Sequence, residues 1–275
     1  MGRKRLTQIL PWLLPLRVKQ KVFCFYLKMK LDRNRYALRQ ADELLPHLLF
    51  ESHCPMYNRN TGFDMVYQEN KVFNLKLAAA TMEKLLIRPG ETFSFWQLVR
   101  YADRDTPYKE GLVEIDGKLT TRPGGGLCQI SNLLFWIFLH TPLTIVERRG
   151  HLVRDFPEPK SDAPTGVDAT VSEGWTDLKV RNDTQTTFQI SFAFDEEQII
   201  GRIFADRDEG LTYEIINGEP SYYRKKGAVY EEVDIRQKIV VSASGECIAS
   251  KLLYQNRCRI GYPLPAETLI EEKGS

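Results

Sequence analysis

The sequence lacks the features of a disulfide framework, a structural zinc domain or a membrane span. Its five cysteines, listed by position as 24, 54, 128, 247 and 258, are odd in number and show no Cys-x-x-Cys spacing. This usage favours a reducing compartment, although Cys247 and Cys258 fit either a pair facing each other across a hairpin or two reduced thiols. No apolar run reaches the roughly 20 residues that cross a bilayer.

A large charge of one sign is also missing. Thirty-eight basic and 36 acidic residues leave a net charge of only +2. Because proteins that bind the phosphate backbone of nucleic acids usually have a large excess of positive charge, we expect no nucleic-acid partner. No Lys-Ser or Lys-Thr follows the glycines at 124–126, and we find no dinucleotide fingerprint, internal repeat or low-complexity segment. We therefore expect no nucleotide cofactor, and predict none of any other kind.

What is present is a globular composition, with 275 residues of which 43% are hydrophobic. The patterns predict an α+β fold with a helical N-terminal portion, a mixed central core around a glycine-rich turn and a buried helix, and an antiparallel β C-terminal portion. The predicted organisation is a basic helical segment at 1–60, a core at 61–175 and a β-rich portion at 176–275.

The spacing of apolar residues and the turn signals predict individual elements. Helices are expected at 32–50, where Pro46 should bend or end the helix, at 70–88 with Asn70 as cap, and at 127–139. Strands are expected at 143–147 and from 168, and 92–95 reads either as a short strand or as the lead-in to a helical turn. Alternation around Asp116-Gly117 predicts a hairpin over 112–120. Beyond 177, strands are expected at 178–180, 188–194, 198–204, 211–216, 228–241 and 246–254.

Three consecutive glycines, Gly124, Gly125 and Gly126, precede the predicted buried helix and place Cys128 in its first turn. There the free backbone N–H groups and the positive end of the helix dipole favour a thiolate, which suits a nucleophile. Ser131 shares the helix face of Cys128. The alternative is that the glycines form a tight turn and Cys128 is a small core residue.

Cys128, His151 and Asp168 occur in the order Cys, His, Asp, as in transglutaminase-like and papain-like enzymes, where the acid orients an imidazole that activates the thiol. Gln129 or the backbone N–H groups of the glycine turn are candidate donors to an oxyanion. Two alternatives remain open: a structural His151–Asp168 pair beside an inert thiol, and a zinc site using the same three side chains. The second has no additional ligand pair, so we predict no metal.

Basic residues surround His151. Arg149, together with Arg148 and Arg154 and beside Glu147, can bind the carboxylate of a peptide terminus, or can form a solvated strand end. The predicted substrate-binding set is therefore Gly124, Gly125, Gly126, Gln129, Ser131 and Arg149.

Residues 1–40 contain eleven Lys or Arg and one acidic residue, interleaved with aromatic residues and leucines. This pattern fits a segment that meets anionic lipid, or a basic face whose apolar side packs on the protein body. Residues 6–16 imitate a signal peptide, but Pro11 and Pro15 interrupt the run and no small-residue cleavage site follows. We expect a retained terminus and a cytoplasmic protein, with the inner face of the membrane as a candidate contact.

The segment around the glycines resembles the signature of the VanW family, and the resemblance extends over roughly residues 70 to 185. The motifs that carry it are Pro123-Gly124-Gly125-Gly126-Leu127-Cys128-Gln129-Ile130-Ser131, residues 88–95, residues 145–151 and residues 166–171. The resemblance implies a role in glycopeptide resistance or cell-wall biology, with a cell-wall peptide or peptidoglycan precursor as partner. Two hypotheses follow: a thiol-dependent amidase or acyl-transfer enzyme, and a non-catalytic module that binds cell-wall peptides or a resistance partner.

Overall fold

The computed structural model describes residues 11–115, 118–157 and 161–272 and shows the predicted mixed α+β fold. The turn residues of the predicted hairpin, Asp116 and Gly117, lie outside the described residues. The helical elements are η1 (Pro11–Leu13), α2 (Leu14–Leu31), α3 (Val66–Ala80), α4 (Phe95–Val99) and α5 (Cys128–Leu139). The strands of the first part of the chain are β1 (Arg35–Tyr36), β2 (His47–Pro55), β3 (Leu86–Ile87), β4 (Glu91–Ser94), β5 (Glu110–Ile115), β6 (Lys118–Pro123), β7 (Thr144–Glu147) and β8 (Val153–Arg154).

The second part of the chain is built from strands, as its alternating pattern predicts. They are β9 (Lys179–Arg181), β10 (Phe188–Phe194), β11 (Gln198–Ala205), β12 (Leu211–Asn217), β13 (Ser221–Lys225), β14 (Ala228–Val241), β15 (Cys247–Ile260) and β16 (Ile270–Glu272). The first three of these strands join earlier ones, in the sheet orders β1-β4-β9-β7 and β2-β11-β10-β3. The C-terminal part of the chain thus completes the sheets around the centre.

Helix α5 lies at the centre of the core. Its residues from 133 to 139 are all buried, because the helix is apolar around its whole circumference. It packs against β2 and β11 on one side, and on another the ring of Phe138 meets that of Phe93 on β4, with centroids 5.0 Å apart. Leu133 lies against Gly201, where a side chain would leave no room. This packing fixes the position of the helix start, where Cys128 stands.

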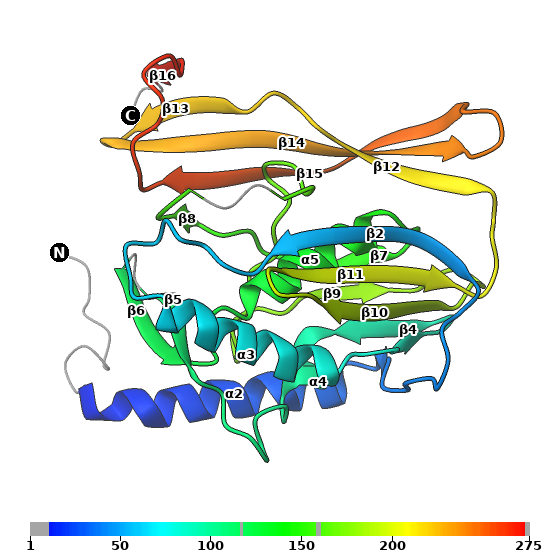
Figure 1. The fold of residues 1–275 in the computed structure, drawn as a ribbon, viewed down its shortest axis with the longest axis horizontal. Helices are drawn as coiled ribbons and strands as arrows, with labels where there is room; N and C mark the ends of the chain where they lie inside the picture. The colour runs from blue at the N-terminus through cyan, green and yellow to red at the C-terminus, as the bar shows by residue number, and fades with distance from the viewer. Residues whose placement is uncertain (1–10, 116–117, 158–160, 273–275) are drawn as a thin grey trace.

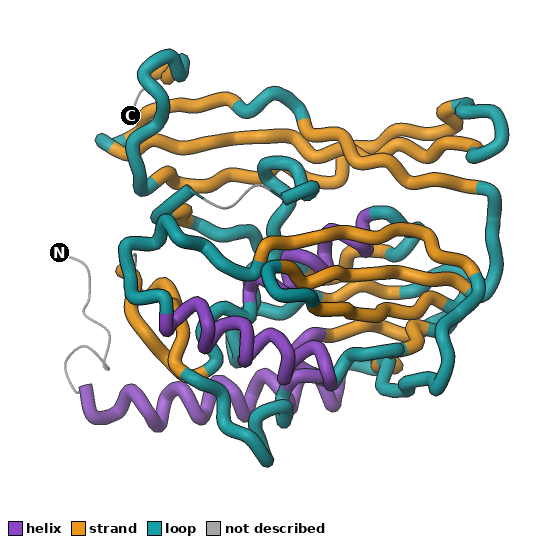
Figure 2. The backbone as a smooth tube through the Cα atoms, in the orientation of Figure 1, coloured by secondary structure: helices purple, strands orange, loops and turns teal. Residues whose placement is uncertain are grey.

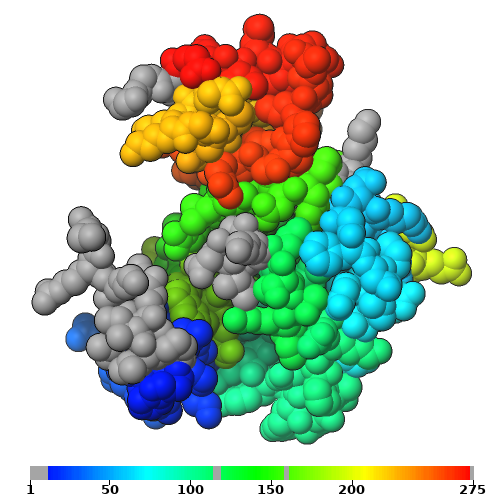
Figure 3. All heavy atoms as spheres, turned by 90° about the vertical axis from the view of Figure 1, so that its left-hand side faces the viewer, coloured from blue at the N-terminus to red at the C-terminus, as the bar shows by residue number. Residues whose placement is uncertain are grey.

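A long sheet of strands β12 to β16 with β8 forms a separate layer above this body (Figures 1 and 2). In Figure 3 it stands as a lobe, coloured yellow to red, over the green and cyan body. Its antiparallel centre is the β14–β15 hairpin, and β8 pairs in parallel with the end of β15. Because β8 begins two residues after His151, this pairing anchors the segment just beyond the imidazole to the upper layer.

The helix predicted over 32–50 does not form. Its residues supply β1 and the start of β2, which pairs with β11 from His47 to Pro55. Leu44 and Leu48, two of the residues whose helical spacing suggested a buried face, are 46% and 51% exposed. Pairing with a strand more than 140 residues later outweighed the local pattern, since strand formation depends on neighbours as well as on propensity.

Other boundaries also differ from the expectation. α3 begins at Val66, whose N–H donates to Asp64 Oδ1 at 2.9 Å, whereas Asn70 lies within the helix and donates to the Glu110 carbonyl. The strand expected from 168 does not form, and the segment has only an isolated bridge between Ser172 and Thr176 before β9. Among the described helices, none combines the length and the apolar character needed to cross a membrane.

Cys247 and Cys258 do not face each other across a hairpin. Both lie on β15, where they pair with Val240 and Glu231 of β14. Eleven residues of extended strand separate them by roughly 36 Å, beyond the reach of a disulfide. None of the five cysteines, all of which lie within the described ranges, forms a disulfide.

Replacement of Gly125 by alanine is expected to lower the free energy of unfolding by at least about 2 kcal/mol. An added methyl would stand 2.1 to 2.6 Å from the Gly111 backbone of β5, which has no flexible atom to move aside. Urea denaturation of the two proteins measures the difference. Gly218→Ala is the matched control, because its methyl would meet nothing closer than 3.7 Å. Equal stability of the two variants would contradict this account of the glycine turn.

Candidate active site

Cys128 is the first residue of α5, directly after the glycine turn. Its thiol is partly buried, with Sγ 3.3 Å from Thr170 Oγ1 and 3.6 Å from the Val171 carbonyl oxygen. The first backbone N–H groups of a helix have no partner within it, so the thiol stands where negative charge is stabilised. The predicted placement of the thiol is therefore what the structure shows.

His151 and Asp168 meet beside this thiol. Asp168 Oδ2 accepts hydrogen bonds from the His151 backbone N–H at 2.7 Å and from its Nδ1 at 2.8 Å. With Nδ1 held by the carboxylate, Nε2 is the ring nitrogen left for a second partner. The imidazole and the Cys128 thiol interact, each changing the pKa of the other. The structure thus places the side chains of the three predicted residues in series: the thiol contacts the imidazole, and the imidazole contacts the carboxylate.

The pKa values of Cys128, His151 and Asp168 are all shifted from their ordinary values. Burial raises the pKa of the Cys128 thiol, but His151 and the Thr170 hydroxyl outweigh that effect and hold it below its ordinary value. Burial likewise lowers the pKa of His151, yet Asp168 and Cys128 raise it well above the usual range. Burial raises the pKa of Asp168, while His151 and Arg148 bring it below normal. These shifts favour the pair of a thiolate and an imidazolium, held by a carboxylate, over the neutral pair.

Arg148 holds the other side of Asp168. Its guanidinium donates to Asp168 Oδ1 at 2.6 Å, to the Asp168 carbonyl at 2.6 Å and to Asn256 Oδ1 at 2.8 Å. It also lies 4.1 Å from the centre of the Tyr254 ring. The side chains of Arg148 and Asp168 are only 10% and 13% exposed, so this pair is largely shielded from water. Asn256 and Tyr254 belong to β15, so the upper sheet helps to orient the site.

Two residues of α5 position the segment that carries Asp168. Ser131 is fully buried and its hydroxyl donates to the Ala169 carbonyl, while Asn132 Oδ1 accepts from the Ala169 N–H at 2.7 Å. The next amide, that of Thr170, donates to the Arg149 carbonyl at 2.7 Å. Ser131 therefore supports Asp168 through the backbone of its neighbour, and its hydroxyl is already engaged.

The three glycines shape the approach to Cys128. Gly124 and Gly126 have positive φ angles of 78° and 93°, which favour glycine. A side chain on Gly126 would overlap that of Lys71, and the Gly125 carbonyl accepts from Asn74 Nδ2 at 3.1 Å. Asn74 is fully buried on α3 and anchors the turn. These contacts are with the protein itself, and a substrate contact at the glycines remains a prediction.

Gln129 and Arg149 have different surroundings. The Gln129 amide donates to the Pro55 carbonyl at 2.6 Å and contacts Cys54 Sγ at 3.2 Å, so it ties α5 to the end of β2. Arg149 is exposed beside His151. The other two arginines of the predicted basic rim have partners within the protein: Arg148 turns inward, and Arg154 pairs with Glu231 at 3.2 Å. The predicted basic rim is reduced to Arg149.

Two residues that the sequence analysis did not single out, Thr170 and Gly150, shape the site through tertiary contacts. Thr170 was visible only as part of a family motif, and its contact with the thiol depends on how 166–171 folds back. Gly150 precedes His151, and a methyl there would come within 2.6 to 3.0 Å of Asn256, Arg148 and Asp168. A glycine next to a candidate histidine was the one available signal. Within the described ranges, no group of three His, Cys, Asp or Glu side chains is arranged to hold a metal ion.

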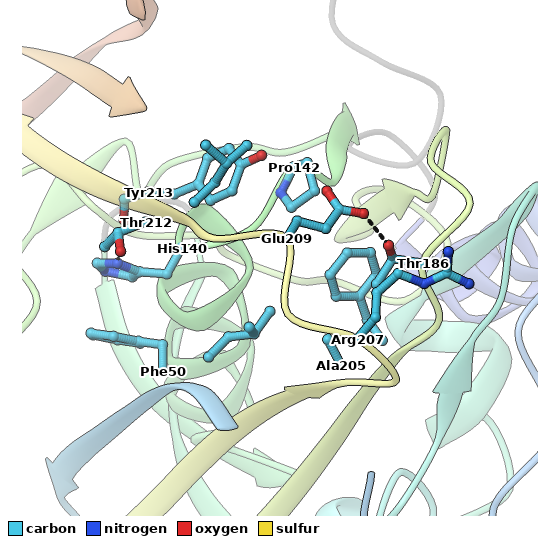
Figure 4. A pocket seen from close by; sticks show the side chains of 12 residues that line it. Phe50, His140, Pro142, Thr186, Ala205, Arg207, Glu209, Thr212 and Tyr213 are labelled. Atoms are coloured by element: carbon cyan, nitrogen blue, oxygen red, sulfur yellow. Dashed lines mark hydrogen bonds between the residues drawn. The ribbon is translucent and has the colours of Figure 1, made fainter. Parts of the chain in front are cut away.

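A hollow at the other end of α5 is a separate feature (Figure 4). There His140 Nδ1 lies 2.7 Å from the Tyr213 carbonyl, and its ring stacks on Phe50. Burial lowers the pKa of His140 to about 4, so the ring is neutral at pH 7. The helix between His140 and Cys128 is about 18 Å long. We place the candidate active site at Cys128, because a thiol, an imidazole and a carboxylate meet there, whereas none of the described residues that line the hollow beside His140 is a cysteine.

Comparison with known proteins agrees with the motif around Cys128. The family model described as VanW like protein matches residues 70–204, which include Cys128, His151 and Asp168. A Vancomycin B-type resistance protein VanW from Enterococcus faecalis is 59% identical over 272 residues, covering 99% of both chains. An uncharacterized protein, YoaR, from Bacillus subtilis is 36% identical over 114 residues, covering 42% of this chain and 36% of its own. No solved structure matches the chain.

Proposed function

The chain belongs to the VanW family, and from this premise we propose that it is a thiol-dependent amidase or acyl-transfer enzyme that acts on cell-wall peptides in glycopeptide resistance. One observation supports the catalytic part of the proposal: the thiol of Cys128, the imidazole of His151 and the carboxylate of Asp168 interact in series. The thiol pKa is lowered and the imidazole pKa is raised, which is the pattern of an activated cysteine nucleophile.

In the first half of the proposed reaction, the Cys128 thiolate attacks the carbonyl carbon of an amide. The negative charge that develops on the carbonyl oxygen is stabilised by the positive end of the α5 dipole. His151 then gives its Nε2 proton to the leaving nitrogen, the C–N bond breaks, and the amine departs. The products are a free amine, an acyl thioester on Cys128 and a neutral imidazole, which Asp168 keeps oriented through Nδ1.

In the second half, the neutral imidazole of His151 takes a proton from a water molecule or an amine as that group attacks the thioester. The C–S bond breaks and the thiolate of Cys128 leaves. Water gives a carboxylic acid and therefore hydrolysis, whereas an amine gives a new amide and therefore acyl transfer. The imidazolium and the thiolate are restored, so the protein is regenerated and only the two substrates are consumed.

The substrate class rests on the family rather than on the site. The relative from E. faecalis carries vancomycin resistance in its name, so a peptide of the cell wall or a peptidoglycan precursor is the substrate class we propose. Arg149, exposed next to His151, is the residue we assign to a substrate carboxylate, because guanidinium groups bind carboxylates with two parallel hydrogen bonds.

The pH dependence of Cys128 alkylation tests the proposed chain. Because the thiol pKa is lowered, its reaction with iodoacetamide should persist well below about pH 8, where an ordinary thiol is mostly protonated. Catalytic turnover should rise with pH through the lowered thiol pKa and fall again through the raised His151 pKa, giving a bell-shaped profile. Mass spectrometry of the Cys128 peptide separates its reaction from that of the exposed Cys24 and Cys247.

His151→Ala supplies the control for this experiment. Without the imidazolium, the inflection of alkylation at Cys128 should move to higher pH, while Cys24 on α2 should react as before. A Cys128 that stays unreactive across this range in the native protein would argue against a nucleophile. The same result would support the second hypothesis, in which the family fold binds cell-wall peptides or a resistance partner without cleaving them.

A further inference from the structure

Helix α2 has two apolar faces, and one of them packs on the protein body. Tyr26 and Met29 are 7% and 4% exposed, and Val22 and Phe25 pack partly against the same core. The Tyr26 hydroxyl donates to Glu173 Oε1 at 2.7 Å, and the Arg100 guanidinium lies 3.7 Å from the centre of the Tyr26 ring. The helix is therefore held along the edge of the molecule opposite the C-terminal sheet (Figure 1).

The other apolar face is turned to solvent. It consists of large side chains at intervals of four or seven residues, which place them on one stripe along the helix. They are Trp12 of the adjoining η1 at 67% exposed and, on α2 itself, Leu16 at 59%, Phe23 at 67%, Leu27 at 42% and Leu31 at 71%. A stripe of this size on a soluble protein marks a contact surface, because single exposed apolar residues are normal but contiguous ones are not.

The charge around this stripe indicates what covers it. Arg17, Lys19, Lys28 and Lys30 are exposed on the same helix, and residues 14–31 contain no acidic side chain. Lysine and arginine beside an exposed apolar stripe that includes tryptophan are typical of helices that lie in the interface of an anionic bilayer. A helix of 18 residues is about 27 Å long and lies flat here, so the whole stripe can meet a surface at once.

We propose that α2 docks the protein on the surface of an anionic lipid bilayer. The stripe of Trp12, Leu16, Phe23, Leu27 and Leu31 enters the boundary between headgroups and acyl chains, and the lysine and arginine side chains reach the lipid phosphates. The C-terminal sheet then points away from the membrane, since α2 and that sheet lie on opposite sides of the molecule (Figures 1 and 3). Of the two alternatives from the sequence, packing on the body is observed for one face of α2, and contact with lipid is what we propose for the other.

Vesicle co-sedimentation of the full chain tests the proposal. Binding to phosphatidylcholine vesicles with about 30% phosphatidylglycerol should exceed binding to pure phosphatidylcholine about 10-fold, and should weaken as salt rises. The double variant Phe23→Glu/Leu27→Glu should reduce the partition coefficient about 10-fold or more. Leu269→Glu is the matched control, because Leu269 is 88% exposed but lies far from α2 in sequence, just before β16, and its loss should leave binding unchanged.

Two further readouts make the outcome decisive. Lys19→Glu/Lys30→Glu should weaken binding to the anionic vesicles while leaving the apolar stripe intact. Unfolding curves verify that the exposed substitutions leave the fold unchanged. Equal binding of all variants, or equal binding to both vesicle types, would overturn the proposal. So would a shift from oligomer to monomer on gel filtration caused by Phe23→Glu/Leu27→Glu, because the stripe would then join copies of the chain.

Discussion

Replacing Cys128 with serine should lower the turnover of a cell-wall peptide at least about 10³-fold while changing the free energy of unfolding by less than about 1 kcal/mol. The hydroxyl is not ionised at neutral pH, so the ion pair with His151 is lost together with the nucleophile. The protein can accommodate serine, since Thr170 Oγ1 and the Val171 carbonyl already lie beside the sulfur and can bond to a hydroxyl.

The measurement pairs turnover with stability. Product from a synthetic cell-wall peptide is followed by chromatography, the acyl-enzyme by the intact mass of the protein, and stability by urea denaturation. Cys24→Ser on α2 is the control and should behave as the parent, because the Cys24 thiol is exposed to solvent. A serine variant that keeps its turnover, or one that loses turnover only as its fold is lost, would show that Cys128 is a packing residue.

Removing the carboxylate of Asp168 should produce the largest loss of stability among the variants considered. Asp168→Ala leaves the shielded guanidinium of Arg148 without the oxygen it bonds at 2.6 Å, and the His151 backbone N–H and ring lose their shared acceptor. Breaking a buried ion pair from one side typically costs about 3–5 kcal/mol. Urea denaturation at pH 7 measures this cost.

The pH dependence of this effect has a definite sign. The pKa of Asp168 is lowered by folding, so its contribution to stability is present above the pKa of the unfolded chain and is lost as pH falls through the lowered value. The difference between Asp168→Ala and the parent should therefore shrink in acid. The thiol of Cys128 should also become harder to ionise in the variant, because the imidazolium that stabilises it has lost its own partner.

Asp183→Ala provides the matched control. Asp183 and Arg181 form an ion pair of the same 2.6 Å length, but their side chains are 46% and 45% exposed. Exposed ion pairs contribute little, because water already stabilises the separate charges. Similar stability of Asp168→Ala and Asp183→Ala would mean that burial of the Arg148–Asp168 pair does not matter to the fold.

Short-range chemistry in the sequence was enough to predict several elements. The helix around 127–139 was predicted with nearly its observed bounds, because its start after the glycines and its end before Pro142 are local signals. The β5–β6 hairpin and six of the eight strands from β9 to β16 follow from alternation and turn residues in the same way, whereas β13 and β16 were not predicted. The order of Cys128, His151 and Asp168 singled out three residues that the structure places together, although their catalytic role stays a prediction.

Only the tertiary structure decided where distant partners meet. Residues 32–50 became strands because β11, far along the chain, supplied backbone partners that no local pattern reveals. Arg148 turned inward because Asp168 and Asn256, 20 and 108 residues away, offered it oxygens in a shielded place. The pairing of edges and the shielding of charges depend on residues remote in sequence, whereas helix spacing and turn chemistry depend on neighbours. For this reason the sequence by itself determined the start of α5 and its thiol, and tertiary packing decided the surroundings that lower the pKa of this thiol.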